Sequence, residues 1–434
     1  MDKNFRELLK KEYVVFDGAM GTMLQAAGMK MGETPEVLSI TQPQLLVGIH
    51  EKYLRAGADV IYANTFGANR YKLEECGKSV DEIVKASIKN AKQACENVNP
   101  QALVALDVGP IGQLLEPTGT LSFEEAYDMY REIVEAGSAA GADLVVFETM
   151  TDLLECKAVL AAKEHSDLPV AVTMTFEINQ RTFTGCCIES MALTLSGLGV
   201  DALGVNCSLG PAELEPVVAK LSEWTNLPII VKPNAGLPDP VTNEYNVSPE
   251  EFAQMMKNLR KYGIKVFGGC CGTTPDFIRC VSEMLHTDGN AGFWHEKEIP
   301  AAVCSPTKAV TITEPRIIGE RINPTGKKLF KEALLRGDMD YILNQALEQI
   351  GAGADILDVN VGLPGIDEKE MMISAVKSIQ AIVDVPLQVD STIPEVLDAA
   401  LRVYNGKPIV NSVNGEEKSL KAVLPLVKKY GAAV

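Results

Sequence analysis

The sequence predicts an α/β protein with one complete (β/α)8 TIM barrel followed by an incomplete second TIM-type barrel. Short apolar runs alternate with helix-like segments along the chain, which is typical of βαβ units. The runs lack strict polar alternation, as expected of strands buried on both faces. Eight of them occur in about 285 residues, which favours a closed barrel. An open doubly wound sheet is the alternative, but no G-x-G-x-x-G motif follows the first run.

The first eight runs are rich in Val, Ile, Leu and Phe. The segments between them have the apolar period of helices, and the one over 122–140 opens with Ser122 and Glu125 in capping-box spacing. The strands expected from this pattern are Val14–Ala19, Asp59–Phe66, Ala102–Val108, Asp143–Met150, Pro169–Phe176, Ala202–Ser208, Pro228–Ala235 and Lys265–Gly272.

The pattern breaks from His286 to Glu314, in a stretch with Gly, Pro and charge but no sustained period. After this stretch the βα rhythm restarts. We therefore expect a complete (β/α)8 barrel over 1–290, a linker over 291–315 and the N-terminal half of a second barrel over 316–434.

In the second domain, four strands precede an ending that resembles the start of a fifth, Gly431–Val434. Half a barrel would leave open sheet edges, so the sequence is interpreted as a partial product. The expected strands are Arg316–Asn323, Asp355–Gly362, Pro386–Thr392 and Pro408–Asn414, and helices are expected near Tyr341–Gly351, Glu368–Val383 and Lys418–Tyr430.

Composition and charge restrict the function classes. The 434 residues are 46% hydrophobic and 23% charged, which suits a globular protein with a large core. A net charge of −18 disfavours non-specific binding to nucleic acid or an anionic membrane. No run approaches the ~20 apolar residues of a membrane helix, and no signal peptide precedes the first strand. We expect a cytoplasmic protein with reduced cysteines and with neither nucleic-acid nor membrane partners.

Three cysteines form the strongest constellation in the sequence. Cys207 stands at the end of the sixth expected strand, and Cys270 and Cys271 stand at the end of the eighth, so all three thiols should meet at the C-terminal rim where barrel active sites lie. Thiolates suit tetrahedral Zn²⁺, and three protein ligands leave the open position of a catalytic site. The alternative is that each is an ordinary buried cysteine. A second pair, Cys186-Cys187, lies well past the fifth strand and is expected to stay away from the metal.

The strand-end motifs resemble those of the homocysteine S-methyltransferase family over about residues 8–290. They are DGAMGT (17–22), NTF (64–66), ET (148–149), NCS (206–208), KPNAG (232–236) and GGCCGT (268–273). The resemblance implies that Cys207, Cys270 and Cys271 bind zinc. It also implies that the ammonium and carboxylate groups of homocysteine are bound by Asp17, Gly18, Thr65 and Glu148, and Asn234 could fill the open zinc position without substrate.

The chemistry expected at such a site starts from an unreactive thiol. A free thiol has a pKa of about 8.5 and is mostly protonated at neutral pH. Zinc would hold the homocysteine sulfur as a thiolate, which could then attack a donor methyl group. Asp17 and Glu148 have an alternative interpretation as helix-cap or rim salt-bridge carboxylates.

Polar residues also stand at the strand ends of the second domain. The segment GERINPTGKK (319–328) lacks the spacing of a phosphate-binding P-loop. The strand ends resemble the pterin-binding barrels of folate-dependent methyltransferases and dihydropteroate synthase. This resemblance implies that a pterin edge contacts carboxylate and amide side chains, although each could instead cap a βα loop: Glu320, Asn323, Asp358, Asn360, Asp390 and Asn411.

Both domains in this order resemble the N-terminal part of the cobalamin-dependent methionine synthase family. That resemblance implies transfer of a methyl group from methyltetrahydrofolate to a corrinoid, and from methylcobalamin to homocysteine. No D-x-H-x-x-G motif for cobalamin binding occurs here, so a cobalamin-binding module would act in cis or in trans. The alternatives are a homocysteine methyltransferase that uses betaine or an S-methyl sulfonium donor, and a non-catalytic scaffold or sensor of the methionine pathway.

Overall fold

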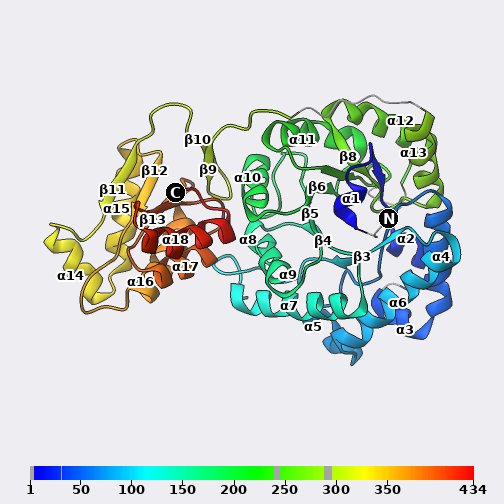
Figure 1. Ribbon diagram of the computed structural model, residues 1–434, viewed down its shortest axis with the longest axis horizontal. Coiled ribbons are helices and arrows are strands. Elements are labelled where there is room, and N and C mark those ends of the chain that lie inside the picture. The colour runs from blue at the N-terminus through cyan, green and yellow to red at the C-terminus, as the bar shows by residue number, and fades with distance from the viewer. Residues whose placement is uncertain (1–3, 31, 239–244, 288–295) are drawn as a thin grey trace. The chain divides into compact units, whose positions relative to one another are not determined.

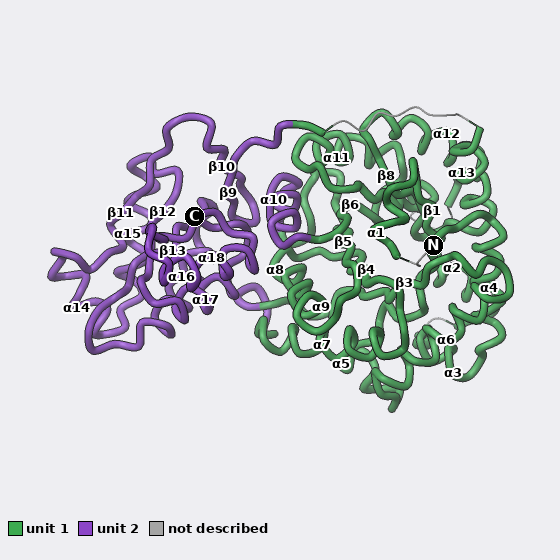
Figure 2. The backbone as a smooth tube through the Cα atoms, viewed as in Figure 1, with its two compact units in different colours: residues 1–115, 120–184, 200–297 green, residues 116–119, 185–199, 298–434 purple. Residues whose placement is uncertain are grey.

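The computed structural model describes residues 4–30, 32–238, 245–287 and 296–434 (Figure 1). The chain forms two compact units, coloured separately in Figure 2. Unit 1 comprises Met1–Leu115, Thr120–Thr184 and Val200–Lys297, and unit 2 comprises Glu116–Gly119, Gly185–Gly199 and Glu298–Val434. The domain limits expected at 290 and 315 remain a prediction.

The sheet of unit 1 is a parallel eight-stranded barrel. Its strand order is β1-β8-β7-β6-β5-β4-β3-β2, and a parallel bridge between Phe16 and Val60 joins the two outer strands of that order. The predicted complete barrel is therefore confirmed. The strands are β1 (Val14–Val15), β2 (Val60–Tyr62), β3 (Leu103–Val108), β4 (Leu144–Met150), β5 (Val170–Met174), β6 (Ala202–Asn206), β7 (Ile229–Lys232) and β8 (Ile264–Phe267).

All eight strands occur where the sequence predicts them, but most end several residues earlier. The β6 ladder stops because the chain leaves the extended conformation at Cys207, directly after the strand, where φ is 62°. β4 reaches its expected end at Met150 but is irregular at Thr149, which has φ 60° where the pairing with β5 shifts register. The residues that were expected to complete these strands therefore lie on the rim of the barrel, where function-bearing loops occur.

The barrel helices begin with local signals that the sequence carries. Ser79, Ser122 and Ser248 form capping boxes with a glutamate three residues later, which satisfies backbone N–H groups at the helix start. The helices of this region are α2 (Met20–Ala26), α3 (Leu38–Thr41), α4 (Pro43–Arg55), α5 (Arg70–Leu73), α6 (Val80–Val98), α7 (Phe123–Ala140), α8 (Leu153–Cys156), α9 (Val159–His165), α11 (Pro211–Trp224), α12 (Pro249–Leu259) and α13 (Pro275–Thr287).

The barrel interior is a packed apolar core. Phe16, Tyr62, Val146 and Ile230 belong to one buried cluster of strand side chains. The short helix α1 (Phe5–Leu8) adds Phe5, which is fully buried in the same cluster. This packing fixes the strand ends that carry the polar residues of the rim.

Unit 2 contains a four-stranded parallel sheet of order β11-β12-β13-β14. Its strands are β11 (Ile318–Ile322), β12 (Ile356–Val359), β13 (Leu387–Asp390) and β14 (Ile409–Asn411). Its helices are α14 (Lys328–Arg336), α15 (Met339–Gly351), α16 (Glu368–Ile382), α17 (Pro394–Val403) and α18 (Glu417–Tyr430), together with α10 (Ile188–Leu198).

Two features of unit 2 differ from, or extend, the expected pattern. The stretch expected to be an irregular linker contains an antiparallel hairpin of β9 (Ala302–Cys304) and β10 (Ala309–Thr311). Short β-branched segments on either side of a turn explain the hairpin, although they are too short to show a period. At the other end, Ala433 forms a parallel bridge with Ile409, in agreement with a fifth strand beginning there.

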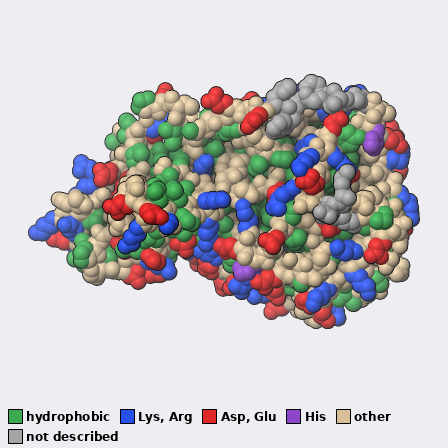
Figure 3. All heavy atoms as spheres, in the orientation of Figure 1, with side chains coloured by type: hydrophobic (Ala, Val, Ile, Leu, Met, Phe, Trp, Pro, Cys, Tyr) green, Lys and Arg blue, Asp and Glu red, His purple; other side chains and the backbone are tan. Residues whose placement is uncertain are grey.

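The surface carries charges of both signs. Figure 3 shows Lys and Arg side chains interspersed with Asp and Glu over the face in view. Among the described residues, no helix is both long enough and apolar enough to cross a membrane.

Candidate metal centre and substrate pocket

The three predicted cysteines meet at the C-terminal rim of the barrel. Their sulfur atoms all lie within 4.8 Å of one another, and the Sγ atoms of Cys207 and Cys271 are 3.8 Å apart. Among the described residues, no other group of three or more His, Cys, Asp or Glu side chains is close enough to hold a metal ion. The competing pair does not join them, since Cys186 and Cys187 are both buried elsewhere and the Cys187 sulfur lies 3.1 Å from the Ser190 hydroxyl.

Backbone turns bring the sulfur atoms together. Cys207 and Ser208 both have a positive φ, at 62° and 58°, and the Cys207 N–H donates to the Lys232 carbonyl at 3.1 Å. A side chain at Gly269 would lie 2.3 Å from the Thr273 hydroxyl oxygen, and Gly272 has φ 80°. Only glycine fits such close approach and adopts this conformation without strain, which lets two adjacent cysteines face one site.

Without a metal ion the three thiols hold their protons. A hydrogen bond with Cys270 lowers the pKa of the Cys207 thiol, but the Cys271 thiol and burial outweigh it and raise that pKa to about 11. A hydrogen bond with Cys207, together with burial, raises the pKa of Cys270 well above its usual value. Three thiolates this close need a cation between them, so the donor set fits Zn²⁺ with one position left for another ligand.

A cavity of about 240 Å³ adjoins the cysteines, and the charged side chain of Lys232 forms part of its wall. The Lys232 ammonium is 3.2 Å from Glu148 Oε2 and 3.9 Å from Asp17 Oδ1, and it lies 3.4 Å from the centroid of the Tyr62 ring. The Lys232 side chain is only 3% exposed. Burial lowers the pKa of Lys232, but Glu148 and Asp17 outweigh it and raise that pKa, so the side chain stays charged.

More carboxyl groups than cations surround this cavity. Burial raises the pKa of Asp17 to about 7 against the opposing effect of Lys232. Burial and the nearby Glu148 raise the pKa of Asp107 well above its usual value. With Lys232 as their shared cation, the three carboxyl groups can still accept a second positive charge from a ligand.

Several buried polar atoms at this site have no hydrogen-bond partner. They are Asp17 Oδ1, Tyr62 Oη, Asp107 Oδ1 and Asn234 Oδ1. Buried polar groups are ordinarily paired, so a cluster of unpaired ones beside a cavity indicates a place for a polar ligand.

The predicted homocysteine-binding residues all lie in this region, but not all of them line the cavity. Gly18 and Glu148 line the cavity with the three cysteines. Asp17 lies behind it and accepts a 2.8 Å hydrogen bond from the Tyr62 N–H. The Thr65 hydroxyl is already engaged, since it donates to the Asp107 carbonyl at 2.7 Å. Its backbone is engaged as well, since the Thr65 N–H donates to the Ala63 carbonyl at 2.8 Å and the Thr65 carbonyl accepts from the Ala68 N–H at 3.0 Å.

The predicted pterin residues also gather, at the ends of β11 to β14 in unit 2. Asn360 Nδ2 donates to Asp390 Oδ2 at 2.9 Å, and Asn323 Nδ2 donates to Glu320 Oε1 at 3.2 Å. Asp358 is buried, its Oδ2 has no partner, and burial raises its pKa to about 6. Hydrogen bonds from Gln388 and from Asn411 oppose that rise, which places both amides beside this carboxyl group.

Comparison with known proteins agrees with this geometry. The family model described as homocysteine S-methyltransferase matches residues 14–285. The chain belongs to the homocysteine S-methyltransferase family. A second family model, described as pterin binding enzyme, matches residues 319–434.

Two curated relatives of this family member are methionine synthases. Those of Mycobacterium leprae (strain TN) and Mycobacterium tuberculosis (strain ATCC 25618 / H37Rv) are 32% and 31% identical to it over 464 and 463 residues. Both alignments cover the whole chain but only 38% of the relative, so the chain spans little more than a third of their length.

A solved structure resembles the barrel of this homocysteine S-methyltransferase family member. The metallated form of the homocysteine methyltransferase MmuM from Escherichia coli has a TM-score of 0.56 and 26% identity, covering 64% of this chain and 98% of that one. Its oxidized form matches with the same TM-score and identity.

Lys232, Asp107 and Tyr62 belong to the site, but the sequence analysis assigned them no role. Lys232 stands in the KPNAG motif at the end of β7, and Asp107 is the single acidic residue of the apolar strand β3. A charged residue near the end of an otherwise apolar barrel strand was the available signal. Tyr62 carried no such signal, because a tyrosine at a strand end is ordinary core material.

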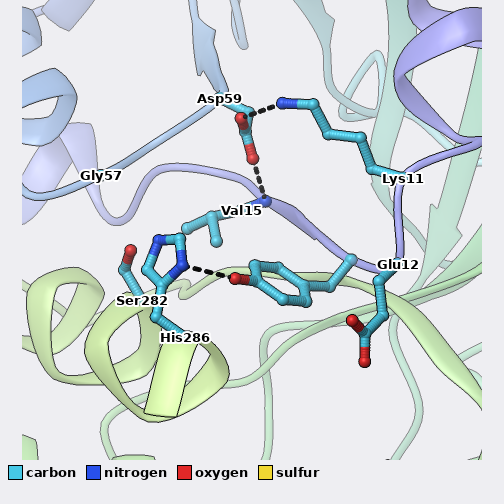
Figure 4. A pocket seen from close by; sticks show the side chains of 8 residues that line it. Lys11, Glu12, Val15, Gly57, Asp59, Ser282 and His286 are labelled. Carbon is cyan, nitrogen blue, oxygen red and sulfur yellow. Dashed lines mark hydrogen bonds and ion pairs between the residues drawn. The ribbon is translucent and has the colours of Figure 1, made fainter. Parts of the chain in front are cut away.

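A second pocket of this family member lies at the N-terminal ends of the barrel strands, and its volume is about 280 Å³ (Figure 4). There Lys11 pairs with Asp59 at 3.0 Å, and the Tyr13 hydroxyl lies 2.7 Å from His286 Nδ1. These contacts tie the segment before β1 to β2 and α13. In a TIM barrel this end serves stability rather than catalysis.

Proposed function

We propose that the chain is a zinc-dependent S-methyltransferase that methylates homocysteine to methionine. The observation that carries the proposal is the meeting of three thiols, within 4.8 Å of one another, beside a cavity with an excess of buried carboxyl groups. An amino acid that carries both a thiol and an ammonium group matches the two halves of this site. The family match and the MmuM likeness support homocysteine as that amino acid.

Cys207, Cys270 and Cys271 would hold the zinc ion. When bound, zinc would lower the pKa of the substrate thiol so that its sulfur reacts as a thiolate at neutral pH. Asn234 Oδ1, which is buried without a partner, is the proposed occupant of the remaining metal position before substrate binds.

The chain's own residues would bind and orient the amino-acid end of the substrate. Glu148 and Asp17 would receive the ammonium group, and Lys232 would hold the Glu148 carboxylate in place from the other side. Gly18 lets the chain after β1 pack closely against Thr273, because a side chain at position 18 would lie 2.8 Å from the Thr273 hydroxyl oxygen. Thr65 would support the site from behind, because its hydroxyl holds the Asp107 carbonyl in place.

The proposed methyl donor is methylcobalamin, carried by a module in cis or in trans and recharged by methyltetrahydrofolate at unit 2. When bound, the corrinoid would supply the methyl group to the homocysteine sulfur and retain the electron pair of the bond that breaks, and the thiol proton would be released. Whole-chain similarity to methionine synthases and the pterin-binding match support this donor. Glu320, Asn323, Asp358, Asn360, Asp390 and Asn411 are the proposed folate contacts.

Methyl transfer to homocysteine tests the proposal directly. The zinc-loaded chain is supplied with methylcobalamin, betaine or an S-methyl sulfonium compound as donor. We expect methionine from methylcobalamin and about one zinc per chain, with both lost in Cys207→Ser. Methionine formation from betaine or from the sulfonium compound, but not from methylcobalamin, would contradict the proposed donor. Unchanged zinc content in Cys207→Ser would contradict the metal site.

A further inference from the structure

Asn206, the last residue of β6, connects the metal ligands to the substrate pocket. Its side chain is fully buried, and it directly precedes Cys207. Asn206 belongs to the NCS motif (206–208), in which the sequence predicts a role for Cys207 alone. Its amide makes four hydrogen bonds, which reach Thr149 in β4, Thr173 in β5 and Cys270 after β8.

The oxygen side of the amide holds β4 and β5. Asn206 Oδ1 accepts from the Thr149 backbone N–H at 2.9 Å and from the Thr173 hydroxyl at 2.8 Å. Because a backbone N–H can only donate, the first of these bonds fixes which end of the amide is oxygen. The nitrogen side therefore faces the other pair of contacts.

The nitrogen side of the amide reaches a side chain of the pocket and a metal ligand. Asn206 Nδ2 donates to the Thr149 hydroxyl at 2.7 Å and to the Cys270 sulfur at 3.7 Å. The Asn206 amide thus makes two hydrogen bonds with Thr149, one to its backbone and one to its side chain, and it also contacts one of the three converging thiols. Thr149 and Cys270 both line the cavity.

The grip on Thr149 matters because its backbone is strained. Thr149 has φ 60°, a region that a β-branched residue rarely adopts. Such a conformation persists only where its surroundings over-determine it. The two bonds from Asn206 supply that constraint, and Glu148, whose carboxylate meets Lys232, is the residue immediately before Thr149.

The contact with sulfur has a separate effect. An N–H donor to a metal-bound thiolate stabilises the charged ligand and fixes its direction. Asn206 can supply this donor only with its oxygen turned toward the Thr149 N–H, as it is here. Both halves of the site therefore depend on one orientation of one amide.

We propose that Asn206 is a positioning residue. It aligns strand β4, which carries the proposed substrate-binding carboxylate of Glu148, with the metal ligands. Through Thr149 it sets the direction of Glu148, and through Cys270 it stabilises the thiolate form of a metal ligand. This inference rests on the proposed function for its substrate half. Its metal half can be measured without turnover.

The test compares Asn206→Asp with Asn90→Asp. Asn206→Asp keeps the acceptors for Thr149 and Thr173 but replaces the amide N–H groups that face Thr149 and Cys270. Asn90 is another buried asparagine, whose amide donates to the Ser39 carbonyl at 2.8 Å from helix α6, so its variant reports the general effect of an acid in the interior. Zinc affinity is measured by chelator competition, and homocysteine affinity by calorimetry on zinc-saturated protein.

We expect Asn206→Asp to bind zinc about 10-fold to 100-fold more weakly, while Asn90→Asp stays within about threefold of the parent. The homocysteine dissociation constant should also rise in Asn206→Asp. Equal zinc affinity in Asn206→Asp and the parent, or equal losses in the two variants, would overturn the inference. Zinc binding without any methylation by the parent chain would refute the proposed function but leave the metal half of this inference intact.

A second substitution separates the two effects and guards against misfolding. Glycine adopts positive φ freely, so Thr149→Gly removes the strain that Asn206 controls. In the double variant Asn206→Asp/Thr149→Gly, homocysteine affinity should recover relative to Asn206→Asp, whereas zinc affinity should not. Recovery of both, or of neither, would show that Asn206 does not act through Thr149.

Discussion

In the eight-stranded sheet of unit 1 each strand pairs on both edges, and the bridge from Phe16 to Val60 completes the ring. In the four-stranded sheet of unit 2, β12 is fully buried, but only Ile322 of the five β11 residues is buried. Closure in unit 1 buries Lys232, Asp17, Asp107 and Glu148 near the strand ends, whereas Asp390 and Asn411 of unit 2 remain half-buried. Buried carboxyl groups are therefore compensated by the Lys232 cation in unit 1, whereas the buried carboxyl group of Asp358 in unit 2 is held by the amides of Gln388 and Asn411.

The largest expected contrast between the units comes from the metal ligands. Cys270→Ser should abolish zinc binding and reduce homocysteine methylation by more than about 100-fold, because the site loses a charged ligand. Folate binding by unit 2 should be unchanged. Zinc content by plasma emission, methionine formation and equilibrium dialysis with methyltetrahydrofolate measure the three quantities. A parallel loss of folate binding would mean that the variant is misfolded.

Removing the buried cation should cost more than removing an exposed one. Lys232→Met leaves Glu148 and Asp17 buried without their partner, and we expect a loss of about 3–5 kcal/mol in the free energy of unfolding. The matched control is Lys377→Met, since Lys377 pairs with Glu116 at 3.1 Å on the surface of unit 2 and should cost about 1 kcal/mol or less. Urea unfolding of both variants gives the difference. Equal losses would contradict the role of closure.

Acid should act on unit 1 through His50. Burial lowers the pKa of His50 to about 4, and neither ring nitrogen has a partner. The folded state thus favours neutral His50, so this contribution to stability is complete above about pH 6.5 and is lost as the pH falls toward 4. The loss should reach about 3 kcal/mol, and no histidine occurs in the residues of unit 2.

His50→Leu isolates this effect, because its unfolding free energy should fall less steeply between pH 7 and pH 4 than that of the parent. Urea titrations at several pH values give both slopes. The leucine itself adds a pH-independent offset, so only the difference in slope carries the result. Parallel slopes would show that His50 has the same pKa in the folded and the unfolded chain and would contradict this role.

A smaller effect is expected at Asp358, a buried carboxyl group among the predicted pterin contacts of unit 2. Asp358→Asn removes a carboxyl group that would accept hydrogen bonds from a pterin, and we expect methyltetrahydrofolate to bind about 10-fold more weakly. Zinc binding should be unaffected. Dialysis or fluorescence quenching measures the dissociation constant, and an unchanged value would remove Asp358 from the proposed contacts.

The smallest effect is expected at the second cysteine pair. Cys187→Ala removes a buried thiol that contacts Ser190 rather than the three converging cysteines, so zinc stoichiometry and affinity should match the parent. Loss of zinc in this variant would show that the metal site extends beyond Cys207, Cys270 and Cys271.

Much of this arrangement was predictable because it depends on local pattern. Apolar runs located the twelve strands, and the capping box at Ser122 marked the start of α7. The rule that parallel strands end on one rim brought Cys207 together with Cys270 and Cys271. The hairpin of β9 and β10 escaped prediction because three-residue strands are too short to show a period.

The sequence by itself determined which residues stand at the strand ends, and thereby the three thiols and the family. Only the tertiary structure decided how their charges are compensated. Lys232 pairs with Glu148, and Asn206 bonds to Thr149, so both contacts join strands that are far apart in the chain. Asp107 is buried beside them. Such contacts depend on side-chain direction and burial, which follow from barrel closure and leave no periodic signal in the sequence.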